Sequence, residues 1–282
     1  HCVCGAEHNG NITTHGADDK TKFATKLYST SGKYKWFIQK PDAFNSTPLE
    51  LNKNNQWVLK EGCYYLADDS TNSGCTEHTF KIEGNVTICL NGKKIEKTGD
   101  AIGPVFEVPT DSTLTLTNCK DTGKDTGIMF DYSSDGTGSG VYVNGGTLNL
   151  YSGQITKSKG QQQGEYNDHY GGGVYVTNGG NFNMYGGTIT KNDADYGGGV
   201  YVNGTNSTFT MNGNASVKNN KTANTYATLK GGGVYMDGGT FNMNGGSTIG
   251  GATAAAANTA TSNGGGVYVL NGTFNMNGNA SI

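Results

Sequence analysis

The sequence predicts an all-β protein: a single-stranded parallel β-helix with three strands per coil and a small irregular N-terminal cap. A Gly-Val-Tyr-Val motif, once with Met in the last place, occurs five times between residues 140 and 269. Each copy is followed by a second apolar pair and then by a third apolar residue. Successive copies lie 26 to 34 residues apart and carry no helical apolar stripe. This pattern favours a solenoid of three short strands per unit.

The alternation within each predicted strand indicates which residues face the core. Apolar residues fall at i and i+2, as in Val174 and Val176 or Phe182 and Met184, so both members of a pair point to the same side. Many of the 46 glycines stand at the expected corners, where the backbone turns sharply. A hydrophobic content of 34% is sufficient for a solenoid, because each coil buries its faces against two neighbours.

Three regions follow one another along the chain. Residues 1–50 are polar and non-repetitive and are predicted to form the cap. Residues 51–134 contain strand-like segments without the repeat and are predicted to be irregular opening coils. Residues 135–282 are the regular repeats. The sequence stops within the third strand of the fifth unit, so we expect the repeats to continue beyond residue 282 in a longer protein.

Composition excludes some partners. The net charge is −3, the charges are scattered, and the chain has no Arg, which argues against nucleic acid as a partner. No apolar run approaches the roughly 20 residues that cross a bilayer. We therefore expect no membrane span in this sequence.

Several runs resemble a known family. They are Cys-Tyr-Tyr-Leu at 63–66, Ile-Cys-Leu-Asn-Gly-Lys-Lys-Ile at 88–95 and Leu-Thr-Leu-Thr-Asn-Cys at 114–119, followed by Gly-Gly-Gly-Val-Tyr-Val and Phe-Asn-Met-Asn-Gly-Gly units. The region from about 57 to 282 resembles the large cell-surface proteins of gut Firmicutes that contain right-handed parallel β-helix, pectin-lyase-like repeats. The Ile-Thr-Lys-Asn at 189–192, before Gly-Gly-Gly-Val at 197–200, is more loosely similar to motifs of the chlamydial polymorphic outer-membrane adhesins.

The resemblance implies a location and a function. We expect a secreted or cell-surface module of a larger bacterial protein, adhesin-like, that presents a binding edge. Its expected partner is a host or dietary glycan, or a host surface protein. The alternative is a carbohydrate-active enzyme, either a glycoside hydrolase or a polysaccharide lyase, on a β-helix scaffold.

Cysteine and histidine crowd the N-terminus. Cys2, Cys4, His8 and His15 can offer two thiolates and two imidazoles to a structural Zn²⁺, although a Cys-x-Cys spacing is closer than usual. The alternatives are a disulfide within or beyond this segment, or a disordered tail with incidental thiols. No other cofactor is expected.

The remaining four cysteines suit an exported protein. Cys63 and Cys75 bracket a polar loop, and Cys89 and Cys119 end strands about one coil apart, so we predict disulfides 63–75 and 89–119. For Cys89 and Cys119 the alternative is a pair of buried thiols packed as small hydrophobes.

The middle residue of each repeated motif is predicted to face outward. This forms an exposed tyrosine row whose rings could stack on sugars, flanked by two loop tyrosines. The candidate ligand-binding residues are Tyr142, Tyr175, Tyr201, Tyr235, Tyr268, Tyr170 and Tyr196. The alternative is that the row only stabilises the sheet. Asn149, Asn183, Asn242 and Asn275 should form a second, polar ladder with a structural role.

The loops between the third strand and the next unit vary in length and should project from one edge. Adjoining loops carry Asp168, Asp193 and Asp195. If the chain is an enzyme, these are the catalytic carboxylates, since glycoside hydrolysis needs a converging pair. The alternative is that they are solvated surface charges.

Overall fold

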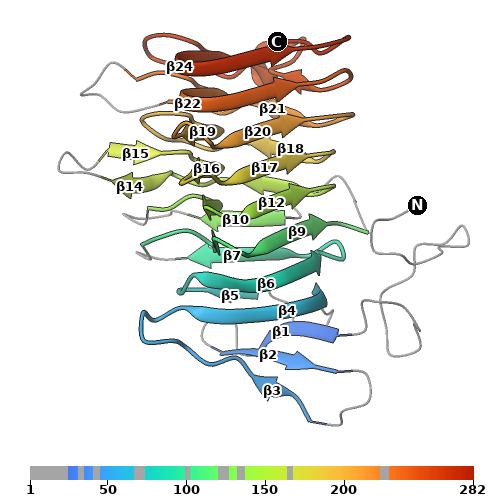
Figure 1. Ribbon diagram of the computed structural model, residues 1–282. Helices are drawn as coiled ribbons and strands as arrows, with labels where there is room; N and C mark the ends of the chain where they lie inside the picture. Colours follow the sequence, from blue (N-terminus) through green and yellow to red (C-terminus); the bar gives the residue numbers. More distant parts are fainter. Residues whose placement is uncertain are drawn as a thin grey trace, which may run out of the picture.

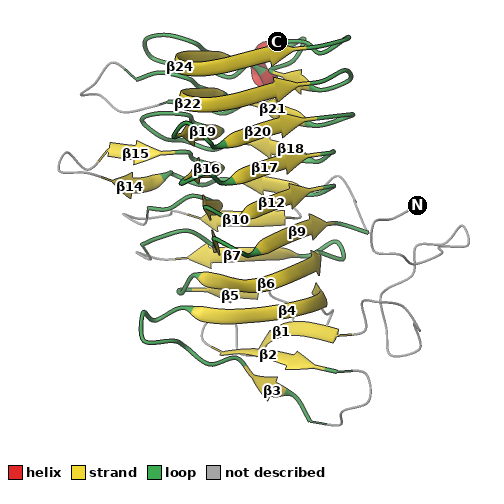
Figure 2. Ribbon diagram, in the orientation of Figure 1, coloured by secondary structure: helices red, strands yellow, loops and turns green. Residues whose placement is uncertain are grey.

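The computed structural model describes residues 25–30, 35–40, 45–66, 74–98, 102–119, 127–131, 137–163, 168–222 and 229–282. These residues form β-strands joined by loops and one 3-10 turn, Ala254–Ala256 (Figure 2). The strands stack like rungs from β3 (Thr47–Pro48) to β24 (Val267–Met276) (Figure 1). Within these ranges, no helix has the length and apolar character needed to cross a membrane.

Most strands belong to three columns, and each strand pairs in parallel with the equivalent strand of the next repeat. Val174, for example, lies between Val141 and Val200. The first column contains β8 (Phe106–Pro109), β11 (Val141–Asn144), β16 (Val174–Thr177) and β19 (Val200–Asn203). The second contains β9 (Thr113–Thr117), β12 (Thr147–Leu150), β17 (Asn181–Met184) and β20 (Thr208–Met211). The third contains β5 (Gly74–Thr76), β7 (Lys94–Thr98), β10 (Gly127–Asp131), β13 (Gln154–Thr156), β18 (Thr188–Thr190), β21 (Ser216–Lys218) and β23 (Thr248–Ile249).

Longer strands connect the first and second columns. They are β4 (Trp57–Leu66), β6 (Phe80–Cys89), β22 (Val234–Met243) and β24. Strand β6 pairs with both β8 and β9, and β22 pairs with both β19 and β20, so the large sheet closes into a ring. At the N-terminal end, β1 (Thr25–Thr30) and β2 (Lys35–Gln39) form an antiparallel pair, and β1 joins β4 in parallel. Part of the predicted cap therefore extends the sheet.

The core is a column of stacked equivalent side chains, as the alternation predicted. Phe182, Phe209 and Phe241 are fully buried. Their rings lie 4.8 and 4.6 Å apart with interplanar angles of 6° and 8°. Such stacking adds to the stabilisation that comes from the burial of apolar surface.

A second interior column is polar, and the sequence patterns considered above did not reveal it. Asn192 and Asn220 are 0% and 1% exposed. Asn220 Oδ1 accepts hydrogen bonds from the backbone N–H and the Nδ2 of Asn192, at 3.1 and 3.0 Å. Its Nδ2 donates to Ile189 O and to Asn258 Oδ1, both at 3.0 Å. The buried amides thus satisfy one another from coil to coil, as buried polar groups must.

The structure describes the side chains of three of the six cysteines, Cys63, Cys89 and Cys119. The Sγ atoms of Cys89 and Cys119 lie 2.8 Å apart, and both residues are buried. Cys63 is half-buried and packs against their cluster, whereas the side chain of Cys75 lies outside the described parts. Both disulfide pairings stay predictions. The predicted zinc ligands Cys2, Cys4, His8 and His15 also lie outside the described residues.

Candidate functional site

The loops after the third strand align along one flank, as predicted. The loop before β16 folds into an antiparallel hairpin of β14 (Gln161–Gln163) and β15 (Asp168–Tyr170). Parallel bridges then join Tyr170 to Tyr196 and Tyr196 to Lys230 in successive loops. This flank presents side chains that lie far apart in the sequence side by side in space.

A glycine turn ends each loop and directs the preceding residue back over the sheet. Gly197 has a φ of +67°, and a Cβ added there would lie 2.3 Å from the carbonyl oxygen of Val200. Only glycine fits this left-handed, crowded position. The turn therefore holds Tyr196 against the tyrosines of the first column.

Seven tyrosines form one cluster on this flank. The ladder Tyr142, Tyr175, Tyr201, Tyr235 and Tyr268 has ring centroids 5.1 to 5.2 Å apart. Tyr170 stacks on Tyr196, with centroids 5.3 Å apart and planes at 17°. Tyr170 also lies 4.9 Å from Tyr201, and Tyr196 lies 5.4 Å from Tyr235.

The predicted exposure of the ladder is wrong for its central members. Tyr175, Tyr201 and Tyr235 are only 8%, 4% and 5% exposed, because the loop tyrosines cover them. Their ring faces contact neighbouring rings, so no sugar can stack on those faces. Tyr142, Tyr268, Tyr170 and Tyr196 are half-buried and form the accessible border of the cluster.

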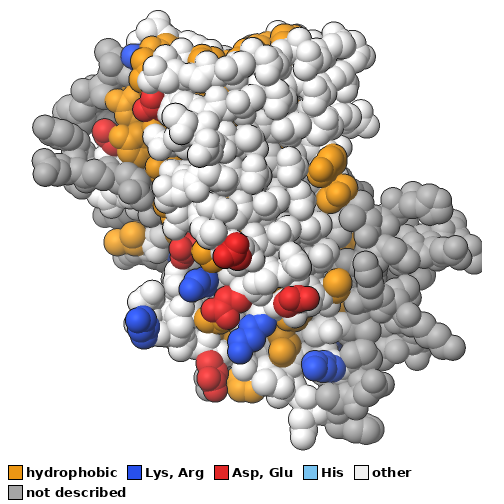
Figure 3. Space-filling model, viewed as in Figure 1, with side chains coloured by type: hydrophobic (Ala, Val, Ile, Leu, Met, Phe, Trp, Pro, Cys, Tyr) orange, Lys and Arg blue, Asp and Glu red, His pale blue; other side chains and the backbone are white. Residues whose placement is uncertain are grey.

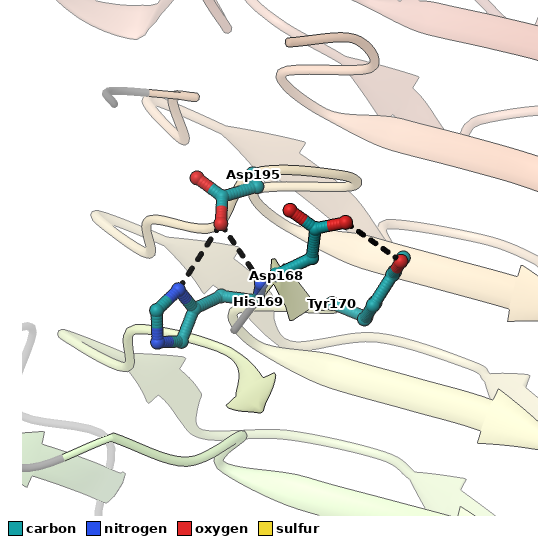
Figure 4. Close-up of polar contacts among 4 residues, drawn as sticks. All are labelled: Asp168, His169, Tyr170 and Asp195. Atoms are coloured by element: carbon teal, nitrogen blue, oxygen red, sulfur yellow. Dashed lines mark hydrogen bonds and ion pairs between the residues drawn. The ribbon is translucent and has the colours of Figure 1, made fainter. Parts of the chain in front are cut away.

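Three polar side chains, Asp168, His169 and Asp195, lie near the loop tyrosine Tyr170 (Figure 4). Asp195 is 4% exposed. Its Oδ2 accepts a hydrogen bond from the backbone N–H of His169 at 2.8 Å and also lies 3.1 Å from Nδ1 of the His169 ring. The hydroxyl of Tyr170 donates to Asp168 Oδ2 at 3.3 Å. The sequence indicated these acids, but it did not indicate that His169 anchors one of them.

Asp193 lies near Asp195 in the same loop, and its carboxyl group is largely buried beside Lys221. Burial raises the pKa of its carboxyl to about 6; the nearby Lys221, with Nζ 3.7 Å from Oδ2, opposes this rise, and Asp195 adds to it. The three predicted acids thus share one flank, and one of them, Asp193, keeps its proton up to about pH 6. A carboxylic acid of this kind can act as a proton donor.

We predict that Asp193→Asn stabilises the protein at neutral pH. The folded carboxyl binds a proton up to about pH 6, whereas in the unfolded chain it loses the proton near pH 3.8. The contribution of this carboxyl to stability is therefore fully present below pH 3.8 and is lost as the pH rises to about 6, a change of about 2–3 kcal/mol. Urea unfolding should show this gain for the variant at about pH 7.5 and none at about pH 3.5. Asp111→Asn, in an exposed turn, is the control, and an equal gain there would contradict the prediction.

The flank also carries a cation that sequence reasoning did not single out. Lys230 Nζ lies 4.9 Å from the centroid of the Tyr268 ring and donates to its hydroxyl at 3.2 Å. Within the described ranges, no group of three His, Cys, Asp or Glu side chains is arranged to hold a metal ion. The recognisable chemistry of the flank is therefore aromatic rings beside carboxylates, one imidazole and two lysines.

Comparison with protein-family models, with curated proteins and with solved structures finds no match to this chain.

Proposed function

We propose that this chain is a right-handed parallel β-helix that serves as an adhesin-like module at a bacterial cell surface. Three columns of parallel strands in a constant register support the helix assignment. A stack of this kind is rigid along its length and displays its loops on one side. That property suits a protein that holds a binding edge away from a cell.

The proposed ligand of the flank is a host or dietary glycan. The observation that carries this proposal is the Tyr170–Tyr196 stack beside Asp168 and His169. Half-buried aromatic rings offer apolar contact to a sugar ring, and carboxylates accept hydrogen bonds from its hydroxyls. The glycine turns and hydrogen bonds fix these groups before binding, which reduces the entropy lost in the complex.

A glycan array carrying neutral and acidic glycans tests the proposal. We expect binding to at least one glycan, and about tenfold weaker binding for Asp168→Asn, since a hydrogen bond to a charged group contributes about 1.5–3 kcal/mol. Asp111→Asn is the matched control and should bind as the parent does. Binding to no glycan, or equal weakening by the two variants, contradicts the proposal.

One observation favours an enzyme as the second candidate. Asp193, whose pKa is raised to about 6, adjoins the buried Asp195 that His169 holds; a carboxylic acid with a raised pKa beside a second carboxyl group is typical of glycosidases. Release of reducing ends from plant and host polysaccharides would support hydrolysis if Asp193→Asn removed it. If the parent protein releases no reducing ends, the enzyme hypothesis is contradicted and the binding module is the remaining proposal.

A further inference from the structure

The outer face of the second column is uniformly polar. In β9, β12, β17, β20 and the second halves of β22 and β24, the first and third residues point outward and are Thr or Asn in every case. Thr147 and Asn149 of β12 thus align with Asn181 and Asn183 of β17. We call these outward side chains the ladder face.

Hydrogen bonds between coils hold the ladder face in order. Asn183 Nδ2 donates to Asn149 Oδ1 at 3.1 Å, and Thr208 Oγ1 donates to Asn181 Oδ1 at 2.7 Å. Each Asn has a second N–H and further acceptor capacity, so the ordered groups can still bind a ligand. The predicted asparagine ladder is thereby confirmed, with Thr210 interrupting it between Asn183 and Asn242.

The ladder face carries no charge among its described residues. Figure 3 shows a broad uncharged surface over β12, β17, β20 and β22, whereas charged side chains gather over the N-terminal coils. There Lys81 and Glu107 occupy paired outward positions in β6 and β8. A charged partner would lose hydration on the ladder face without gaining an opposite charge. The chemistry of this face therefore fits a neutral partner.

An aromatic pair borders the same face. Tyr151 and Tyr185 directly follow β12 and β17, and their rings stack with centroids 4.6 Å apart and planes at 17°. Tyr185 is 43% exposed, in contrast to the covered tyrosines of the flank. An exposed ring held by a second ring is a suitable platform for the apolar face of a sugar.

From these observations we propose that the ladder face binds a neutral, unbranched polysaccharide lying along the stack. Successive coils rise by about 4.8 Å, close to the length of one sugar residue, so each sugar meets one Thr or Asn pair. Sugar hydroxyls both donate and accept hydrogen bonds, as do amides and hydroxyls on the protein. Tyr185 stacks on a sugar at the border. This surface is distinct from the flank and does not depend on the flank's function.

Affinity electrophoresis in gels that contain a soluble mixed-linkage β-glucan, a linear β-mannan or polygalacturonate tests the proposal. We expect at least one neutral polymer to retard the protein, and we expect this retardation to persist at high salt. Polygalacturonate should leave the mobility of the protein unchanged. Tyr185→Ala should weaken the retardation about tenfold. The double variant Asn183→Asp, Thr210→Asp places two charges in the ladder face and should abolish the retardation.

Glu83→Gln, at an exposed position of β6 outside both surfaces, is the matched control and should keep full retardation. Circular dichroism checks that each variant is folded; if the double variant is not, Tyr185→Ala still decides. Absence of retardation by both neutral polymers overturns the proposal, whatever the glycan array shows for the flank. Sedimentation that reveals a dimer dissociated by the double variant also overturns it, because ordered Asn ladders can instead join two copies.

Discussion

Replacing Asn220 with Asp is expected to destabilise the protein by about 3–5 kcal/mol at neutral pH. The substitution keeps the shape but removes the Nδ2 donor that serves Ile189 O and Asn258 Oδ1. A carboxylate would then face two acceptor oxygens in a site that is 1% exposed. A buried charge without a partner is among the most destabilising changes a core can receive.

Thermal unfolding measures the effect, with Asn242→Asp as the matched control. Asn242 belongs to the outward ladder face and is only half-buried, so its replacement should change the free energy of unfolding by about 0.5 kcal/mol or less. Asn220→Asp should lower the Tm by about 10 °C, and the loss should shrink in acid as the new carboxyl is protonated. Equal effects of the two substitutions would show that the inner amide column does not hold the coils together.

Alkali is expected to unfold the protein cooperatively above pH 10. Burial, with Asp237 as the next cause, raises the pKa of Tyr235 to about 12, and burial also raises the pKa of Tyr201. Between pH 10 and 12 the unfolded chain loses phenolic protons that the folded chain retains, so stability falls as the pH rises. For Tyr235 alone the loss approaches about 2–3 kcal/mol, and the other covered tyrosines act in the same direction.

Parallel titrations by tyrosinate absorbance and far-ultraviolet circular dichroism test this expectation. Ionisation of the covered tyrosines should coincide with the loss of strand signal, and Tyr235→Phe should move the transition to higher pH. Complete ionisation near pH 10 with an unchanged strand signal would mean that the ladder is open to water.

The periodic features of the fold were predictable from the sequence. Equivalent residues stack because strand geometry repeats, so the spacing of Val174, Phe182 and Ile189 is sufficient to place all three columns. The same reasoning brought the loop acids to one flank. It also placed the outward tyrosines in one row.

The covering of that row was not predictable by the same route. Tyr170 and Tyr196 lie outside the three columns of strands, and their position depends on left-handed turns such as that at Gly197. The inner amides were missed because they too lie outside the strands, although Asn192 and Asn220 each follow a third-strand apolar residue by three positions.

Lys97 shows most clearly where prediction from the sequence fails. Its sequence neighbours suggest a surface lysine, yet it is 0% exposed and donates to Thr79 Oγ1 and to the carbonyl oxygens of Ile102, Gly103 and Pro104. Burial lowers its pKa to about 7. The carbonyl oxygens of residues 102–104 create this site, and no local pattern encodes their position beside Lys97.

Distances between nitroxide labels test the central claim, that each repeat advances the stack by one strand spacing. Thr113 connects to Thr240 through four parallel pairings and to Thr273 through five. Labels carried on p-acetylphenylalanine at 113 and 240 should therefore lie about 19 Å apart, and labels at 113 and 273 about 24 Å apart. Equal distances for the two pairs, or a shorter distance to 273 than to 240, would contradict the stacked arrangement on which the flank and the ladder face depend.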